Sequence, residues 1–170
     1  NETKSYSDFT IYNSTGALVN GTTVYVYLNG VLKSTNTGIT NSASGTLYVG
    51  TRAADGLYWN GYISDFRVFN GQALYSSNFY PGSTPATPTT TIGTTTYSST
   101  LLLNGTSGGV IDATRTNNLE TVGDSKVTPF SPYNGSYYSN YFNGSTDYIL
   151  TSTQGPQLGT NNFTIEFWIY

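Results

Sequence analysis

The sequence predicts an all-β protein that folds as an antiparallel β-sandwich. Aliphatic residues alternate with tyrosines along residues 24–28, and a period of two is typical of strands with one buried face. The apolar segments are short, and turn-forming dipeptides such as Asn29-Gly30 separate them. No segment carries the sustained 3.6-residue periodicity of a long helix. Many short strands separated by turns indicate two sheets packed face to face.

The first expected element is a β-hairpin. Val24, Val26 and Leu28 share one face of its first strand, and Tyr25 and Tyr27 share the other. The Asn-Gly dipeptide that follows supplies the two positive φ angles of a type I′ turn, and the chain then returns as a second strand.

Further strands are expected on both sides of a linker. Residues 82–98 are rich in threonine and contain proline, so we expect an extended linker that neither buries apolar surface nor pairs as a strand. The other expected strands lie at residues 46–49, 62–69, 100–103, 137–142, 148–151 and 163–170.

The composition excludes several classes of function. Charged residues make up 9% of the 170 residues and the net charge is −3, so no basic nucleic-acid surface is expected. No apolar stretch is long enough to insert into a membrane. The chain has no Cys, Met or His, which excludes disulfides, thiolate nucleophiles, imidazole bases and the usual zinc sites. A surface rich in Thr, Ser, Asn and Gly then favours an extracellular or virion-borne protein. Because the chain begins at Asn1 and shows no signal peptide, we expect an excerpt or a processed product.

Two sets of motifs resemble a known family. Residues 142–148 read Phe-Asn-Gly-Ser-Thr-Asp-Tyr, and residues 158–168 contain Leu-Gly followed by Phe-Thr-Ile-Glu-Phe-Trp. This order resembles the opening of laminin G-like modules in the concanavalin A-like lectin/glucanase superfamily. Residues 27–30 and 61–71 resemble the closing hairpin and strand of such modules. Residues 72–81 resemble tandem modules of phage virion and other surface proteins. The resemblance implies a two-sheet jelly roll whose curved face often binds glycans, sometimes with a structural calcium ion.

The two sets of motifs occur in reverse order. Residues 1–81 resemble the C-terminal half of a module, residues 82–98 form the linker, and residues 99–170 resemble the N-terminal half. The chain is then a window cut from a tandem array, a circular permutant, or a subunit whose halves are completed by a neighbour. The apolar face of the last strand must be covered, so we predict assembly contacts for Phe163, Ile165, Phe167 and Ile169.

Catalysis is not expected. Glycan hydrolysis needs two carboxyl groups placed across the scissile bond. The glutamates Glu2, Glu120 and Glu166 are isolated from one another, and no histidine is present to activate a serine. We therefore predict that the protein is not an enzyme.

Aromatic faces and hydrogen-bonding groups on the expected strands form a candidate glycan site. Strict alternation places Asp65 and Arg67 on the same face as Ile63, opposite Phe66 and Val68. The candidate glycan-binding residues are Tyr25, Tyr27, Trp59, Asp65 and Arg67. In the alternative interpretation, the tyrosines are half-buried sheet residues, the Asp and Arg form a surface pair, and Trp59 lies at the edge of the core.

No motif requires a cofactor. The family resemblance implies that a calcium ion can be present. Asp65 and Asp147 match positions that tend to be acidic in calcium-bearing relatives, although Asp147 also fits a turn residue that bonds nearby backbone N–H groups. Candidate glycosylation sequons begin at Asn13, Asn20, Asn104, Asn134, Asn143 and Asn162.

The sequence favours a non-enzymatic structural or assembly module of an extracellular fibre or virion appendage, repeated in an array. Its partners are then other copies of itself or adjacent modules. The alternative is a carbohydrate-binding, lectin-like adhesin that recognises surface glycans.

Overall fold

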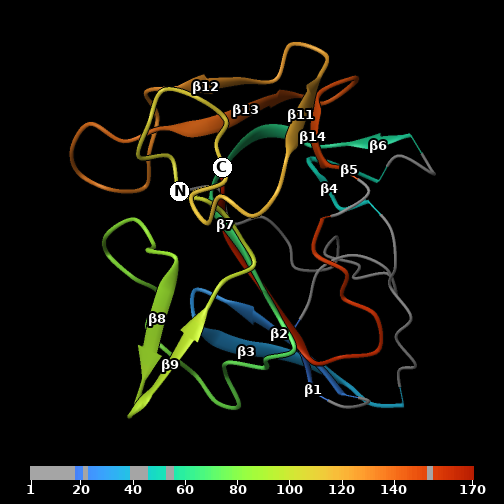
Figure 1. Cartoon of the computed structure of the whole chain (residues 1–170), viewed down its shortest axis with the longest axis vertical. Helices are drawn as coiled ribbons and strands as arrows, with labels where there is room; N and C mark the ends of the chain where they lie inside the picture. Colours follow the sequence, from blue (N-terminus) through green and yellow to red (C-terminus); the bar gives the residue numbers. More distant parts are fainter. Residues whose placement is uncertain (1–17, 21–22, 39–45, 53–55, 153–154) are drawn as a thin grey trace.

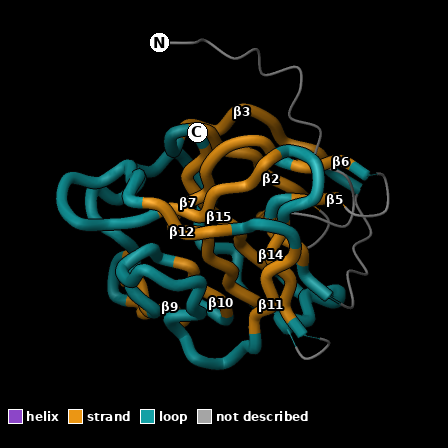
Figure 2. Tube along the Cα trace, turned by 90° about the horizontal axis from the view of Figure 1, so that it is seen from above, coloured by secondary structure: helices purple, strands orange, loops and turns teal. Residues whose placement is uncertain are grey.

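A computed structural model describes residues 18–20, 23–38, 46–52, 56–152 and 155–170, and this part of the chain contains strands and loops but no helix (Figures 1 and 2). The strands pair antiparallel throughout, which confirms the predicted all-β sandwich. The strands are β1 (Leu18–Asn20), β2 (Thr23–Leu28), β3 (Val31–Asn36), β4 (Tyr48–Val49), β5 (Thr51–Arg52), β6 (Leu57–Tyr58), β7 (Asn60–Asn70), β8 (Thr89–Ile92), β9 (Thr95–Ser98), β10 (Leu101–Leu103), β11 (Leu119–Val122), β12 (Lys126–Thr128), β13 (Ser139–Asn143), β14 (Tyr148–Thr151) and β15 (Phe163–Ile169). None of the described residues lies in a helix that could cross a membrane.

The long strand β7 is the centre of the larger sheet. The order of that sheet is β12-β13-β7-β15-β1-β2-β3, and β10 also pairs with β7. One edge of β7 pairs with β13 and β10, with Asn140 opposite Ile63 and Leu102 opposite Arg67. The other edge pairs with β15 along most of its length. Strands from the two sides of residues 82–98 therefore belong to one sheet, with β7 between β13 and β15 (Figure 1).

A smaller sheet of β11, β14 and β4 covers one face of the larger sheet. Fully buried side chains from both sheets meet between them, including Val68, Leu101, Phe142 and Ile149. Packing of two such apolar faces is the main source of stability in a sandwich.

The predicted type I′ turn is present at the β2–β3 hairpin. Asn29 and Gly30 have φ angles of 50° and 73°, which are the two positive values that this turn needs. The predicted alternation along β2 is also present at Val24, which belongs to the core, while Tyr25 and Tyr27 are half-buried on the other side.

The apolar face of β15 lies against the core of its own chain. Phe163 is buried, and Ile165, Phe167 and Ile169 are partly buried against the same cluster. These four residues, predicted to make assembly contacts, are therefore covered at least in part without a neighbouring subunit.

The second edge of β15 is open in the part of the chain that the structure describes. There β15 pairs with β1 only at Phe163, opposite Val19. On the other side, β1 pairs with residues 23–25 of β2. Among the described residues, β1 therefore pairs neither with residues 165–169 of β15 nor with residues 26–28 of β2.

Residues 82–98 contain strands, which corrects the expectation of a linker without pairing. Here β8 and β9 form a hairpin in which Thr91 Oγ1 and Thr96 Oγ1 lie 3.0 Å apart (Figure 1). Gly93, with a φ of 62°, occupies the first position of the two-residue turn. Threonine is β-branched and pairs well across strands, so these residues can form a ladder although they bury little surface.

The polar stretch after β10 is organised by one buried carboxylate. Asp112 is only 4% exposed and accepts hydrogen bonds from the backbone N–H groups of Leu102, Thr114, Thr116 and Asn117, at 3.0 to 3.2 Å. Burial alone would raise the pKa of Asp112, but these bonds and those from the side chains of Thr114 and Asn117 lower it below its ordinary value.

Candidate functional site

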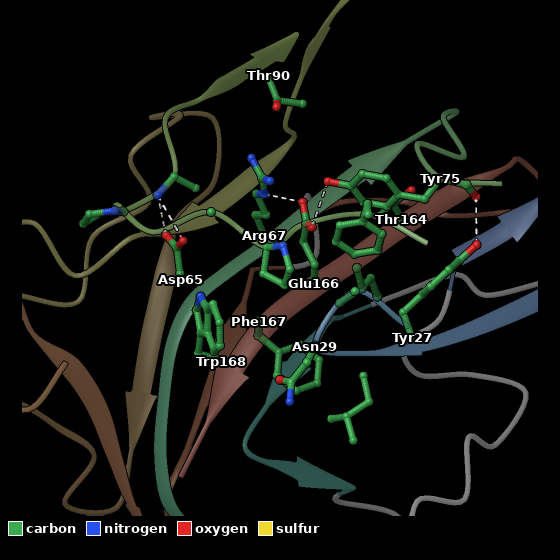
Figure 3. A pocket seen from close by; sticks show the side chains of 18 of the residues that line it. Tyr27, Asn29, Asp65, Arg67, Tyr75, Thr90, Thr164, Glu166, Phe167 and Trp168 are labelled. Carbon is green, nitrogen blue, oxygen red and sulfur yellow. Dashed lines mark hydrogen bonds and ion pairs between the residues drawn. The ribbon is translucent and has the colours of Figure 1, made fainter. Parts of the chain in front are cut away.

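A cleft of about 430 Å³ lies between β2 and β15 (Figure 3). Its walls are residues 25–30 on one side and 164–169 on the other, and β7 contributes Asp65 and Arg67. Parts of the stretch 81–90 complete the lining. The size falls within the range of small-ligand sites in proteins.

One wall of the cleft is a cluster of aromatic rings. Tyr75 and Phe79 are stacked, with ring centroids 3.7 Å apart and an interplanar angle of 8°. Tyr27 meets both rings edge-on, at 6.4 and 5.3 Å. The β2–β3 turn holds this cluster, because the N–H of Phe79 donates to the carbonyl of Gly30 at 2.8 Å. A Cβ atom at Gly30 would lie 1.8 Å from the Phe79 carbonyl oxygen, so the turn needs glycine for this close approach as well as for its positive φ.

A β-bulge in β7 determines which side chains face the cleft. Glu166 pairs with Arg67 and Trp168 pairs with Ser64, so Phe167 is the single residue opposite two residues of β7. The extra residue is Asp65, whose φ of 55° is left-handed. The bulge interrupts the strict alternation. Ile63 consequently belongs to the core with Phe66 and Val68, and its predicted position beside Asp65 and Arg67 is wrong.

The carboxylate of Asp65 joins three segments at the cleft. It accepts a hydrogen bond from the backbone N–H of Ala86 at 2.9 Å and from the Tyr133 hydroxyl at 2.6 Å. The indole N–H of Trp168 in turn donates to Tyr133 Oη at 2.7 Å. Burial raises the pKa of Asp65 above its ordinary value, although Tyr133, Ala86 and nearby Arg67 each act to lower it.

An ion pair lies beside this carboxylate on the same face. Arg67 Nε pairs with Glu166 Oε1, and the Tyr75 hydroxyl donates to Glu166 Oε2 at 3.2 Å. Both charged side chains are largely buried, at 14% and 20% exposure. Burial raises the pKa of Glu166, although the charge of Arg67 acts to lower it. The pKa of Tyr75 is raised as well, mainly by burial and next by the charge of Glu166. The end of the guanidinium group points away from Glu166 toward Thr90 (Figure 3).

The site therefore combines aromatic faces with hydrogen-bond donors and acceptors. Tyr27 and Tyr75 offer ring surface, Arg67 offers N–H donors, and Asp65 and Glu166 offer carboxylate oxygens. Sugars have the complementary chemistry, because their C–H faces stack on aromatic rings and their hydroxyls both donate and accept hydrogen bonds.

Four of the five predicted glycan-binding residues line this cleft, and one does not. Tyr25, Tyr27, Asp65 and Arg67 are part of its walls. Trp59 instead packs against the core, and its backbone N–H donates to the carbonyl of Gly50 at 2.8 Å. Trp59 therefore lies at the edge of the core, as the alternative interpretation of the sequence predicts.

The two predicted calcium ligands do not form one site. Asp147 is fully buried in the β13–β14 turn and accepts hydrogen bonds from the N–H groups of Asp124 and Asn143, at 2.9 and 3.2 Å. Its role is that of the predicted turn residue. Asp65 is engaged with Tyr133 and Ala86 at the cleft. Within the described ranges no group of three or more His, Cys, Asp or Glu side chains is placed to hold a metal ion. Asp65 and Asp147 therefore cannot bind one calcium ion together.

The predicted sequons differ in their surroundings. The Asn104 side chain donates to the carbonyl of Ala86 at 3.1 Å, and Asn143 Oδ1 accepts backbone N–H groups of its own turn. Asn134 is exposed and Asn162 is half-buried. Asn13 and the side chain of Asn20 lie outside the described residues. Glycosylation stays a prediction.

Sequence reasoning did not connect several residues with the cleft. Tyr75, Phe79 and Tyr133 belong to loops, and their register to the strands could not be predicted. In the sequence Glu166 is an isolated acid, because its cross-strand partner Arg67 lies on β7, far away along the chain. A useful signal would have been the opposite charge of two residues on predicted neighbouring strands.

The fold defines this protein as a β-sandwich module, an architecture that fits a lectin-like or a structural module. In agreement, residues 12–78 match the laminin G-type family model of the concanavalin A-like lectin/glucanases superfamily. The match covers less than half of the chain, and it confirms the predicted resemblance for the segment that includes β2, β3 and β7. The comparisons with curated proteins and with solved structures gave no match.

Proposed function

We propose that the protein is a non-enzymatic carbohydrate-binding module of an extracellular surface or virion appendage, with the cleft between β2 and β15 as its binding site. The observation that supports this proposal most directly is the convergence of aromatic rings, Arg67 and two carboxylates on one partly open cleft. Sugars use stacking surface and paired polar groups together, and the matched family model belongs to a superfamily that contains lectins.

The two carboxylates of the cleft support binding of a sugar without hydrolysis. A hydrolase needs one carboxyl group free to protonate the leaving oxygen and a second one to act on the sugar ring. Glu166 is tied to Arg67 and Tyr75, and Asp65 is tied to Ala86 and Tyr133. Both carboxylates are thus held as fixed hydrogen-bond acceptors.

A glycan array followed by calorimetry on the best ligand tests this proposal. Tyr25→Ala removes a ring from the cleft wall and should weaken binding about tenfold, because stacking contributes roughly 1 kcal/mol or more. Tyr80→Ala is the matched control, since Tyr80 is 99% exposed and does not line the cleft. Equal loss in both variants, or no binding to any glycan, would refute the proposed site. Shortened oligosaccharides in the same mixtures would refute the non-enzymatic part.

A structural role in a repeating fibre is the second candidate, and one observation favours it. Residues 165–169 and 26–28 present open strand edges across the cleft in the described part of the chain. Such edges can accept an extended segment of another copy of the chain as an added strand. Sedimentation over a range of concentrations tests this role, because strand exchange would give oligomers, whereas a concentration-independent monomer would argue against it.

A further inference from the structure

We propose that the cleft selects uncharged or amine-bearing sugars and rejects sugars that carry carboxylate or sulfate groups. This inference rests on the proposed carbohydrate-binding function and specifies the class of glycan.

The balance of charge in the cleft is the first reason. Among the described residues that line it, the charged side chains are Asp65, Arg67 and Glu166, that is, two acids and one base. Arg67 is already paired with Glu166. An acidic sugar would therefore meet a described lining with a net charge of −1, in which the charge of Arg67 is already balanced by Glu166, whereas a binding site for carboxylate or sulfate normally supplies an excess of positive charge.

The surroundings of Asp65 are the second reason. Its hydrogen-bond donors, the N–H of Ala86 and the hydroxyl of Tyr133, are neutral dipoles. Asp65 is only 8% exposed, so its charge is weakly screened by water. A second anion beside such a charge is repelled, whereas a hydroxyl can donate to it and an ammonium group can neutralise it.

The aromatic wall acts in the same direction. The faces of tyrosine and phenylalanine rings carry negative electrostatic potential, which attracts cations and repels anions. Tyr75, which is stacked on Phe79, presents such surface next to Glu166 (Figure 3). An amino sugar that stacks here meets both a ring face and a carboxylate.

Calorimetry with three size-matched ligands tests the inference: a neutral oligosaccharide, its amino counterpart and its uronate counterpart. At pH 7 we expect the neutral and amino ligands to bind and the uronate to bind at least about tenfold more weakly. Asp65→Asn should reduce this discrimination several-fold, because it removes one negative charge from the cleft. Asparagine accepts the left-handed φ of 55° at this position, so the bulge can remain.

The control variant is Asp124→Asn, which makes the same change of charge at a side chain that is 81% exposed and outside the cleft. Its discrimination should equal that of the unaltered chain. Binding of the uronate as tight as that of the neutral ligand would overturn the inference and leave the proposed function intact. Loss of discrimination in Asp124→Asn to the same extent as in Asp65→Asn would also overturn it. Failure of all three ligands to bind would overturn the proposed function together with the inference.

Discussion

Replacing Asp112 by asparagine tests whether one carboxylate organises the loop between β10 and β11. Oδ1 accepts the N–H groups of Leu102 and Thr114, and Oδ2 accepts those of Thr116 and Asn117. Whichever oxygen becomes an NH₂ group, it faces two backbone donors. The variant thus loses charge-assisted hydrogen bonds and leaves buried N–H groups unpaired, at roughly 1–3 kcal/mol for each.

We expect Asp112→Asn to lower the free energy of unfolding by about 3 kcal/mol, which corresponds to about 6–12 °C in the melting temperature of a domain of this size. Urea denaturation followed by the fluorescence of Trp59 and Trp168 measures the change. Asp124→Asn is again the control and should leave the midpoint unchanged, because its side chain is exposed. A loss below about 1 kcal/mol in Asp112→Asn would refute the reasoning.

The pH dependence gives the same prediction a second, independent measurement. The pKa of Asp112 is lower in the folded than in the unfolded chain, so its contribution to stability is present above the unfolded pKa. It is lost as the pH falls through the folded pKa. Asp65 and Glu166, whose pKa values are raised by burial, act in the opposite sense and lose their contribution as the pH rises. The difference between Asp112→Asn and the unaltered chain should therefore shrink in acid.

Two further predictions concern the turns. Gly30→Ala places a Cβ atom against the Phe79 carbonyl at a position with positive φ, and we expect it to lower the free energy of unfolding in urea by at least about 1–2 kcal/mol. Gly38→Ala is the control and should lower it less, because its Cβ meets no atom within 4 Å. Asp147→Ala should lower the free energy of unfolding by about 2 kcal/mol, because it leaves the N–H groups of Asp124 and Asn143 unpaired. Calcium or EDTA should not move the melting temperature of the unaltered chain; a rise with calcium that Asp147→Ala abolishes would show that Asp147 coordinates the ion.

The elements that the sequence predicts well depend on short-range signals. The burial of Val24 between half-buried neighbours and the Asn29-Gly30 turn depend on neighbours in the chain, and both are present in the structure. The hairpin at residues 89–98 was missed because its proline- and threonine-rich surroundings indicate a linker, and its pairing needs little burial.

The candidate site was harder to predict because it depends on register between distant strands. The bulge at Asp65 shifts the faces of β7, and nothing local marks it, since aspartate is also common in ordinary turns. Tyr133 reaches Asp65 from a loop 68 positions away. Tyr25, Tyr27 and Arg67 could be proposed from residue type alone, but their partners could not.

The central position of β7 has a consequence for how the chain folds. Its partner β15 begins at Phe163, 93 positions after β7 ends at Asn70. At the usual rate of synthesis, this separation leaves one edge of the strand without its final partner for roughly 5–20 s. Long-range pairing of this kind is also slow to form once synthesis is complete. We therefore expect yield on expression to depend strongly on temperature and on chaperones, and truncation before β15 to give aggregates, because Phe66 and Val68 would lose the strand that pairs beside them.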